Sequence, residues 1–358
     1  MAAQWVFFAT LLIVPLVSSA NSYLQSLQKP SIAKLGAQNV QNGLLLASAA
    51  PAARAAGRSE ILDVIRLDEK MGAYSYAKAK LTKEQSRYGR EESTYKRLSG
   101  GSKDSFVQFY SSSPGLFVME YGLADLRRFV DARGPLRGAE LQYAFRAMTA
   151  AISLLHSRGL VWTDLKLENF ILVPKSRTDV AGSLGLAQEY SSSAYKGFQD
   201  SVAAAVKTLP LQKFHIKLID YESCVKNGAS LVDFSVSTLA PEFLDIIANG
   251  QLNSVAGRPS DFKLLTDEAL VASFKLDVWA LGVSMLHLHG GKDVYGAFSG
   301  GDVRAAVNTL TAYSEGRTDL GLGGVQQPLR KLLEAMLQID PRKRVSITGV
   351  QLSSFFLF

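Results

Sequence analysis

Apolar residues recur at three- and four-residue steps in the middle of the chain, which is the spacing of one face of a helix. The stripe ends near His156, and Gly159 supplies a helix stop. We therefore predict a long helix with one buried face, after which Leu160 and Val161 lead into a loop. The residues of the stripe are Leu141, Ala144, Phe145, Met148, Ile152 and Leu155.

Shorter segments have the character of strands. Residues 116–120 and 216–219 are mostly apolar runs, and residues 76–81 alternate between lysines and small or apolar side chains. A second helical stripe follows near the C-terminus. With 358 residues and 47% hydrophobic content, the chain predicts an α+β fold with one large core rather than several independent domains. The C-terminal stripe consists of Leu329, Leu332, Leu333, Met336 and Leu337.

Polar residues gather directly after the first helix. Asp164, Lys166 and Asn169 stand within one short stretch that begins at Trp162. Phosphoryl transfer needs positioning and charge neutralisation, and this spacing suits that work. A helix, a turn and a strand with incidental polar residues is the alternative. The stretch resembles the H-R-D-L-x-x-x-N catalytic loop of protein kinases, with Trp162 and Thr163 in place of the His and Arg.

The resemblance implies a role for each polar group. Asp164 would accept the proton of the substrate hydroxyl, and Lys166 would steady the γ-phosphate of ATP. Asn169 and Asp220 would hold Mg²⁺. A lysine two positions after the aspartate resembles the serine/threonine branch of the family.

The predicted strand 216–219 leads into Asp220, Tyr221 and Glu222, which stand where the family has its D-F-G motif. Glu222 replaces the glycine of that motif. We expect this residue to resist the left-handed backbone that glycine permits, at a cost of roughly 1–2 kcal/mol.

Further motifs follow in the family's order. Ala240, Pro241 and Glu242 match A-P-E. Asp277 opens a segment that resembles the family's central helix, and we expect it to anchor the catalytic loop. Arg344 would pair with Glu242.

The nucleotide-binding half of the domain has a weaker signature. Residues 116–122 resemble a strand that enters the hinge, with Met119 as gatekeeper and backbone groups at Glu120 and Gly122 bonded to adenine. Residues 126–130 suit a helix after this hinge. Gly72 is the one glycine kept in the loop expected to cover the phosphates.

The resemblance also implies an ion pair between a glutamate and a lysine in this half. Glu91 is chosen over Glu92 as its acidic member, with a solvated charged helix as the plainer alternative. Its lysine is Lys78 or Lys80, and surface lysines are the alternative. Residues 60–120 read about one strand short of a complete small lobe.

The resemblance implies a bilobal fold with a small β-rich N-lobe, about 60–120, and a larger helical C-lobe, about 123–358. Two insertions exceed ordinary loop lengths. Residues 174–214 are expected to form a mobile surface loop. Residues 243–275 carry Leu264, Leu265, Leu270, Val271 and Phe274 and are expected to form helices.

The N-terminal segment has the composition of a leader. Residues 1–20 resemble a signal peptide whose apolar run is too short to span a membrane, which needs about 20 apolar residues. Residues 21–59 have four basic and no acidic residues, as in transit peptides. We expect a plastid destination through the secretory route, with secretion or a flexible tail as the alternatives.

Charge and cysteine usage exclude other classes. The net charge of +7 becomes +3 once residues 1–59 are set aside, so nucleic acid is not indicated as a partner. A single cysteine, Cys224, excludes an internal disulfide. The prediction is an ATP- and Mg²⁺-dependent serine/threonine protein kinase with a protein substrate. A pseudokinase scaffold and a small-molecule phosphotransferase of the same fold are the alternatives.

Overall fold

A computed structural model describes residues 44–46, 59–68, 73–82, 84–98, 102–176, 192–231, 234–244, 252–254, 262–264, 271–295 and 303–357. The chain divides into two units. The small unit comprises Met1–Tyr88, Gln108–Tyr121 and Ser176–Ala203, and the large unit comprises Gly89–Val107, Gly122–Lys175 and Ala204–Phe358. A small sheet together with many helices is the α+β class that the sequence predicts.

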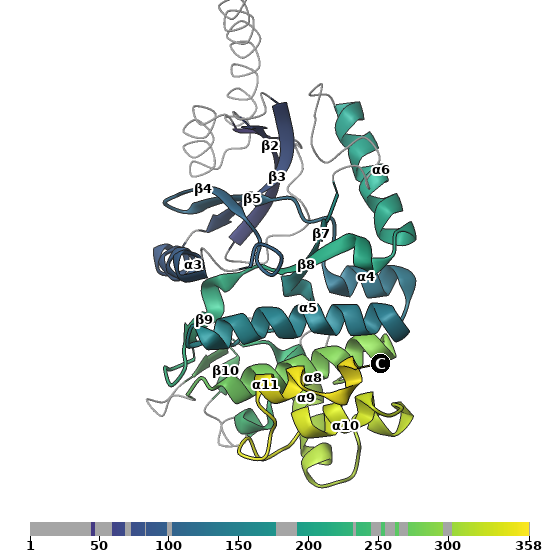
Figure 1. The fold of residues 1–358 in the computed structure, drawn as a ribbon. Coiled ribbons are helices and arrows are strands. Elements are labelled where there is room, and N and C mark those ends of the chain that lie inside the picture. Colours follow the sequence, from purple (N-terminus) through teal and green to yellow (C-terminus); the bar gives the residue numbers. More distant parts are fainter. Residues whose placement is uncertain are drawn as a thin grey trace, which may run out of the picture. The chain divides into compact units, whose positions relative to one another are not determined.

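The small unit contains an antiparallel sheet in the order β1-β2-β3-β5-β4 (Figure 1). One face of this sheet is apolar, because Ala77, Ala79 and Leu81 alternate along β3 with residues that point the other way. Val64, Leu116 and Val118 complete that face. The strands are β1 (Leu44–Leu46), β2 (Ser59–Asp68), β3 (Ala73–Thr82), β4 (Phe109–Ser113) and β5 (Leu116–Glu120).

Strand β1 comes from the segment that the sequence predicts as a leader. Leu44–Leu46 pairs with residues 64–66 of β2, so three consecutive leucines add a strand to the sheet. The described sheet therefore has five strands, and residues 60–120 account for four of them. Gly72 and residues 1–43 lie outside the described residues, which leaves the phosphate-covering loop and the signal segment as predictions.

Helix α3 (Gln85–Leu98) carries both glutamates considered for the ion pair. Glu91 is fully buried, whereas Glu92 is partly exposed and pairs with Lys96 one turn later, at 3.1 Å. The alternative prediction, a helix whose charged residues are all solvated, is therefore wrong for Glu91. The choice of Glu91 over Glu92 as the ion-pair residue stays a prediction.

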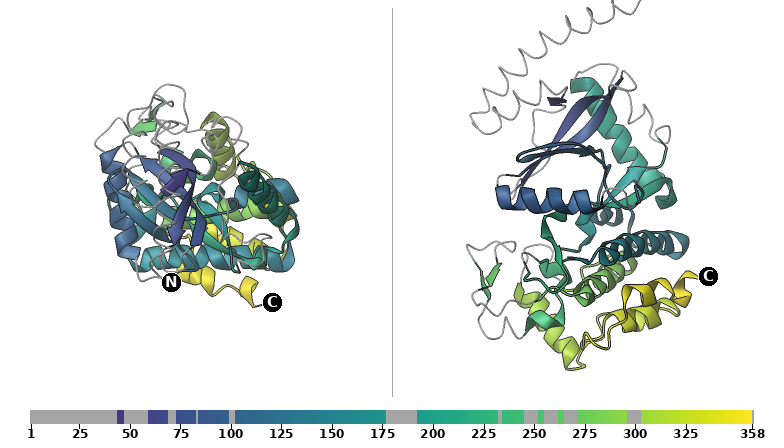
Figure 2. Two further views of the ribbon diagram at one scale, coloured as in Figure 1. Left: turned by 90° about the horizontal axis from the view of Figure 1, so that it is seen from above. Right: turned by 60° about the vertical axis from the view of Figure 1, so that its left-hand side comes forward.

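The large unit is built around two long helices that lie side by side, α5 and α8 (Figure 2). Every residue of the predicted stripe 141–155 is buried on α5, and Gly159 follows the helix with a φ of 70°. The stripe on α10 is buried as well. The helices of this unit are α4 (Leu126–Arg133), α5 (Gly138–Ser157), α8 (Phe274–Gly290), α9 (Val303–Ser314), α10 (Leu329–Met336) and α11 (Ile347–Gln351).

Short strand pairs and 3₁₀ turns carry the polar segments of the large unit. Antiparallel pairing joins β6 to β9 and β7 to β8. The strands are β6 (Leu160–Trp162), β7 (Phe170–Pro174), β8 (Phe214–Leu218) and β9 (Cys224–Lys226). The turns are η1 (Leu167–Asn169), η2 (Leu211–Lys213), η3 (Tyr221–Ser223), η4 (Val236–Thr238), η5 (Pro241–Phe243), η6 (Leu322–Gly324) and η7 (Ser354–Phe356).

The first insertion differs from its prediction. Residues 192–208 form helix α6 (Ser192–Thr208), so a surface loop is wrong for this part of residues 174–214. The sequence carries Phe198, Val202 and Ala205 at steps of four and three, and Phe198 and Ala205 are buried. The Ser, Ala and Gln content of the segment obscured this helical spacing.

The second insertion also differs where it is described. Leu264 lies in β11 (Phe262–Leu264), which pairs with β10 (Leu252–Ser254), and Val271 forms a bridge with Ser230. The prediction that Leu264 and Val271 lie in helices is therefore wrong. Phe274 is the first residue of α8, while Leu265 and Leu270 lie outside the described residues. Within the described residues, none of the helices has the length and apolar character that crossing a membrane requires.

Candidate active site

The catalytic-loop segment leaves β6 at Trp162 and enters the turn η1, so its polar side chains come from one compact stretch. The ammonium nitrogen of Lys166 donates to both carboxylate oxygens of Asp164, at 2.9 and 2.7 Å. Burial alone would lower the pKa of Lys166, but the carboxylate of Asp164, aided by those of Asp220 and Glu168, outweighs it and raises that pKa. Lys166 is therefore a fixed positive charge beside Asp164.

Asn169 is oriented by the same aspartate. Its amide nitrogen donates to the backbone oxygen of Asp164 at 3.0 Å and to the carboxylate at 3.2 Å. The side chain belongs to a buried residue at the end of η1. Since the nitrogen makes these bonds, the amide oxygen is the atom that Asn169 can offer to a cation.

Asp220, at the end of the β8 segment, has a left-handed backbone, with φ of 66° and ψ of 64°. Glu222 lies inside the turn η3 and has no positive φ. Glu222 thus avoids the left-handed backbone, as expected of a residue with a side chain, and the left-handed position lies two residues earlier. The cost of roughly 1–2 kcal/mol belongs to Asp220 instead.

Tyr221 takes the place of the ring that the family motif has after its aspartate. The side chain is fully buried, and its hydroxyl donates to the backbone oxygen of Leu218 at 2.6 Å. Its ring lies edge-on to Phe106, with 6.0 Å between centroids. Tyr221 therefore anchors the turn directly after Asp220.

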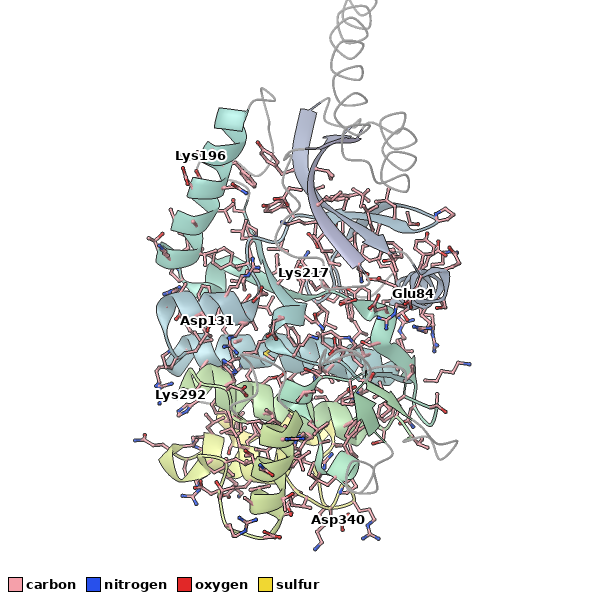
Figure 3. The ribbon with its side chains drawn as sticks, turned by 180° about the vertical axis from the view of Figure 1, so that it is seen from behind. Glu84, Asp131, Lys196, Lys217, Lys292 and Asp340 are labelled. Carbon is pink, nitrogen blue, oxygen red and sulfur yellow. The ribbon has the colours of Figure 1, made fainter. Side chains whose placement is uncertain are left out.

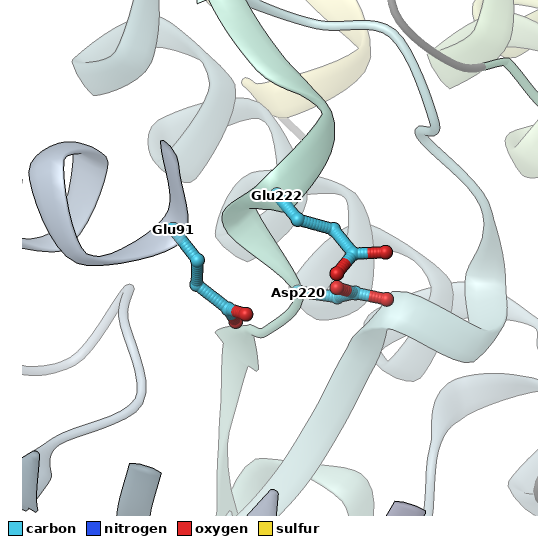
Figure 4. A group of neighbouring side chains, drawn as sticks. All are labelled: Glu91, Asp220 and Glu222. Atoms are coloured by element: carbon cyan, nitrogen blue, oxygen red, sulfur yellow. The ribbon is translucent and has the colours of Figure 1, made fainter. Parts of the chain in front are cut away.

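Three carboxylates meet near this turn. Oxygen atoms of Glu91, Asp220 and Glu222 lie within 4.8 Å of one another. Figure 4 shows the carboxylates of Asp220 and Glu222 next to each other, with Glu91 reaching toward them from α3. Carboxylate and amide oxygens are the ligands that Mg²⁺ prefers, so Asp220 and Asn169 fit this ion by donor type.

The start of α8 holds the catalytic-loop backbone. Both carboxylate oxygens of Asp277 accept from the backbone nitrogen of Trp162, at 3.1 and 3.0 Å, and one of them contacts Nε2 of His156 at 2.8 Å. Burial raises the pKa of Asp277, and the hydrogen bond with His156 opposes that rise. The predicted anchoring contact is confirmed, and His156 has a structural place beside it.

The two residues that stand where the family has His and Arg contact the turn 220–223. The indole nitrogen of Trp162 donates to the backbone oxygen of Asp220 at 3.2 Å, and the hydroxyl of Thr163 donates to that of Ser223 at 3.0 Å. Arg90 of α3 donates to the backbone oxygen of Glu222 at 3.1 Å. The sequence showed Trp162 and Thr163 only as departures from the family motif, and it gave no sign of the Arg90 contact. A hydrogen bond to a backbone oxygen does not depend on the identity of the acceptor residue, so it leaves no sequence motif.

The predicted pair of Glu242 and Arg344 is confirmed. The guanidinium donates to both carboxylate oxygens, at 2.8 and 2.9 Å, and Arg344 is fully buried. This pair joins the turn η5 to the segment before α11.

In the small unit, the two candidate lysines differ. Lys78 pairs with the carboxylate of Asp63 on the neighbouring strand, whereas Lys80 is 4% exposed and lies opposite Phe117 in the register with β5. Glu120 is buried, and its backbone nitrogen donates to the oxygen of Gln108 at 2.9 Å.

Gly122 occupies a position of close approach in the large unit. A Cβ atom there would come within 2.6 Å of the Ile171 side chain on β7. A side chain at this position would therefore force Ile171 to move, independently of any role of Gly122 in binding adenine.

Comparison with known proteins gives the fold. Over 89% of its length the chain superposes on 90% of the solved structure of the Rad53 kinase domain and SCD2, with a TM-score of 0.56 and 15% sequence identity. This chain has a protein kinase-like fold. The predicted fold class is thereby confirmed, and the resemblance to protein kinases is confirmed at the level of the fold.

Sequence similarity is more local. A segment of 88 residues is 33% identical to the NUAK family SNF1-like kinase 2 of Rattus norvegicus, and it covers 24% of this chain and 13% of that protein. No family model matches the chain.

Proposed function

We propose that this chain is an ATP- and Mg²⁺-dependent serine/threonine protein kinase. The observation that carries the proposal is the hydrogen-bonded set of Asp164, Lys166 and Asn169. Asp220 contributes to the field at Lys166 and stands in a left-handed turn with its carboxylate beside that of Glu222 (Figure 4). One acceptor, one fixed cation and two candidate metal ligands are the groups that phosphoryl transfer uses.

Each side chain has a distinct task in this proposal. Asp164 orients the substrate hydroxyl and accepts its proton, because a carboxylate is the acceptor in this set. Lys166 keeps its charge across the physiological pH range, so it stabilises the charge of the transferred phosphoryl group rather than exchanging protons. Asn169 and Asp220 would hold Mg²⁺, which supplies neutralisation of the phosphate charge when it is bound.

In the small unit we assign the nucleotide lysine to Lys80. Lys78 pairs with Asp63 of β2, whereas Lys80 is buried on the same face of β3, further along the strand. Adenine would bond to backbone groups from Glu120 to Gly122. Since the nitrogen of Glu120 already donates to Gln108, the carbonyl oxygen of Glu120 is the group offered there.

A protein substrate is favoured by the pair of Glu242 and Arg344. It holds the turn η5, which resembles the family's substrate platform, against the C-terminal part of the large unit. Lys166, two positions after Asp164, favours serine and threonine as acceptors. Thr163 removes the arginine that reads a phosphorylated loop, so activity should persist after phosphatase treatment of the enzyme.

The test is transfer of the γ-phosphate of ATP to casein and to a basic protein, with Mg²⁺ present. Asp164→Asn should lower the rate at least about a hundredfold, which is the range for loss of a positioned base. Asp131→Asn is the matched control, because Asp131 is exposed on α4 (Figure 3) and pairs with Arg127 one turn earlier on the same helix. A folded wild type that transfers no more phosphate than Asp164→Asn would refute the proposal.

A pseudokinase that acts as a scaffold is the second candidate. It is favoured by the engagement of Lys78 with Asp63, which removes one of two possible nucleotide lysines. Binding of Mg-ATP without phosphate transfer, measured by calorimetry, would support this candidate over the enzyme.

We also propose a plastid destination through the secretory route, from the composition of residues 1–59. Imaging of the full chain with a C-terminal fluorescent tag tests this. Secretion into the medium would favour the alternative.

A further inference from the structure

Helix α6 places an aromatic ring on the sheet of the small unit. The ring of Phe198 stacks on that of Tyr76, with 3.9 Å between centroids and 12° between planes. The ring of Phe198 also lies edge-on to that of Tyr121, with 5.1 Å between centroids. All three side chains are buried, and burial raises the pKa of the Tyr76 hydroxyl. The three rings form one contact that we call the Phe198 stack.

The Phe198 stack lies on the sheet face opposite the apolar core. Side chains alternate along β3, so Tyr76 points to the same side as Lys78 and Lys80, while Ala77 and Ala79 point into the core. On β5, Met119 pairs with Lys78. The face under Phe198 is therefore the face to which the proposed function assigns the nucleotide.

Charged side chains lie beside the Phe198 stack on the same face of the sheet. The ammonium group of Lys78 pairs with Asp63 and lies 4.4 Å from the centre of the Tyr121 ring. The Tyr121 hydroxyl contacts Asp63 at 3.5 Å. Tyr121 stands between Glu120 and Gly122, the two positions assigned to adenine. The protein's own side chains thus occupy the surface that a flat base would need.

We propose that Phe198 occupies the adenine position of the nucleotide site and that release of α6 from the sheet controls nucleotide binding. The inference rests on the proposed function for the identity of the ligand. A purine and a phenyl ring offer the same kind of flat apolar face to a tyrosine, so the two compete for one stacking partner. Binding of the nucleotide then requires that Phe198 leave Tyr76, which lowers the apparent affinity by the fraction of chains in which the ring is released.

The experiment measures binding of Mg-ATP to the full chain by calorimetry. Phe198→Ala and Phe198→Leu remove the ring, and both should bind Mg-ATP at least tenfold more tightly than wild type. Phe198→Leu retains an apolar side chain in case the alanine variant does not fold. Lys196→Ala is the matched control on the same helix, because Lys196 is exposed (Figure 3), and its affinity should equal that of wild type.

A second measurement uses the wild type alone. Saturating Mg-ATP should speed amide hydrogen exchange in residues 192–203, because the nucleotide displaces the ring that holds this part of α6 to the sheet. Unchanged or slower exchange in these residues with nucleotide bound would overturn the proposal.

The outcomes separate this proposal from the proposed function. Tighter binding by both Phe198 variants without phosphate transfer supports the inference and refutes the kinase activity. Phosphate transfer by wild type with an affinity unchanged in the folded variants overturns the inference and leaves the kinase activity standing. Binding by neither wild type nor variants, or weaker binding by the variants, also overturns it.

Discussion

Replacement of Arg344 by methionine should be among the most destabilising single changes in the large unit. Methionine keeps an unbranched apolar stem but removes four donated bonds. Two of these go to Glu242, at 2.8 and 2.9 Å, one goes to the backbone oxygen of Lys275 at 2.6 Å, and one goes to that of Gln338 at 3.1 Å. Arg344 also lies over the ring of Trp279, at 5.0 Å.

The magnitude follows from what the substitution leaves behind. The side chain of Glu242 is 17% exposed, so its carboxylate would remain largely desolvated without a partner. Breaking a buried pair from one side costs roughly 3–5 kcal/mol, and we expect about 4 kcal/mol for Arg344→Met. Glu242→Gln should cost only about 1–2 kcal/mol, because its amide oxygen still accepts from the guanidinium.

The double variant Glu242→Met with Arg344→Met tests whether the unpaired carboxylate of Glu242 causes the loss of stability. Removing both charges removes the desolvated carboxylate, so the double variant should be more stable than Arg344→Met alone. Urea unfolding followed by tryptophan fluorescence suits the measurement, since Trp162 and Trp279 are both buried in the large unit. Coincidence with circular dichroism checks two-state behaviour. A loss under 1 kcal/mol for Arg344→Met, or additive losses in the double variant, would refute the reasoning.

Three further predictions follow from single contacts. Trp162→Phe removes the donor to the Asp220 oxygen, so the Mg²⁺ concentration for half-maximal phosphate transfer should rise; an unchanged magnesium titration would contradict this. Gly122→Ala should lower the free energy of unfolding by about 1–3 kcal/mol through its clash with Ile171, and Ile171→Ala in the same chain should restore part of the loss in urea titrations. Burial, with a contribution from Arg127, lowers the pKa of His287 to about 4, so stability is fully present above the unfolded value of 6.5 and is lost as the pH falls from there toward 4. This difference corresponds to about 3 kcal/mol, and His287→Gln should lack that part of the loss when unfolding is compared at pH 7 and pH 4.5.

The elements that the sequence predicts best are those whose pattern reflects local packing. The stripe of α5 and the partnership of Glu242 with Arg344 were both expected and are both present. The anchoring bond from Asp277 to Trp162 belongs to the same group. Each of the three depends on a helical period or on a motif, and none requires knowledge of which strand lies beside which.

The choice between Lys78 and Lys80 could not be made from the sequence. Both lysines point to one side of β3, because side chains alternate along a strand. Only the register with β2 brings Asp63 opposite Lys78, and register is set by the pairing of strands rather than by either strand alone. The acid that engages Lys78 is therefore a property of the folded sheet.

Helix α6 was missed for a different reason. Its segment is rich in small and polar residues, and composition was given more weight than the spacing of Phe198, Val202 and Ala205. Part of the burial of this helix comes from rings on β3 and β5, at Tyr76 and Tyr121, which are distant in sequence. A helix stabilised by such contacts gives a weak signal of its own.

Three departures from the kinase motifs, Trp162, Thr163 and Glu222, lie in or contact the turn 220–223. The left-handed backbone falls on Asp220, so the residue at the glycine position is free of that strain and can carry a carboxylate. Three donors hold the turn: Trp162 donates to the backbone oxygen of Asp220, Arg90 to that of Glu222, and Thr163 to that of Ser223.

These donors are Trp162, Thr163 and Arg90, all of them unmodified side-chain types in the large unit. Hydrogen bonds of roughly 0.5–1.5 kcal/mol each offset the roughly 1–2 kcal/mol of strain at Asp220. A turn held in this way keeps the Asp220 carboxylate in place without a preceding modification. That is why the same residues that depart from the family pattern lead us to expect activity that does not depend on phosphorylation of the enzyme, with access of the nucleotide left as the step that α6 would control.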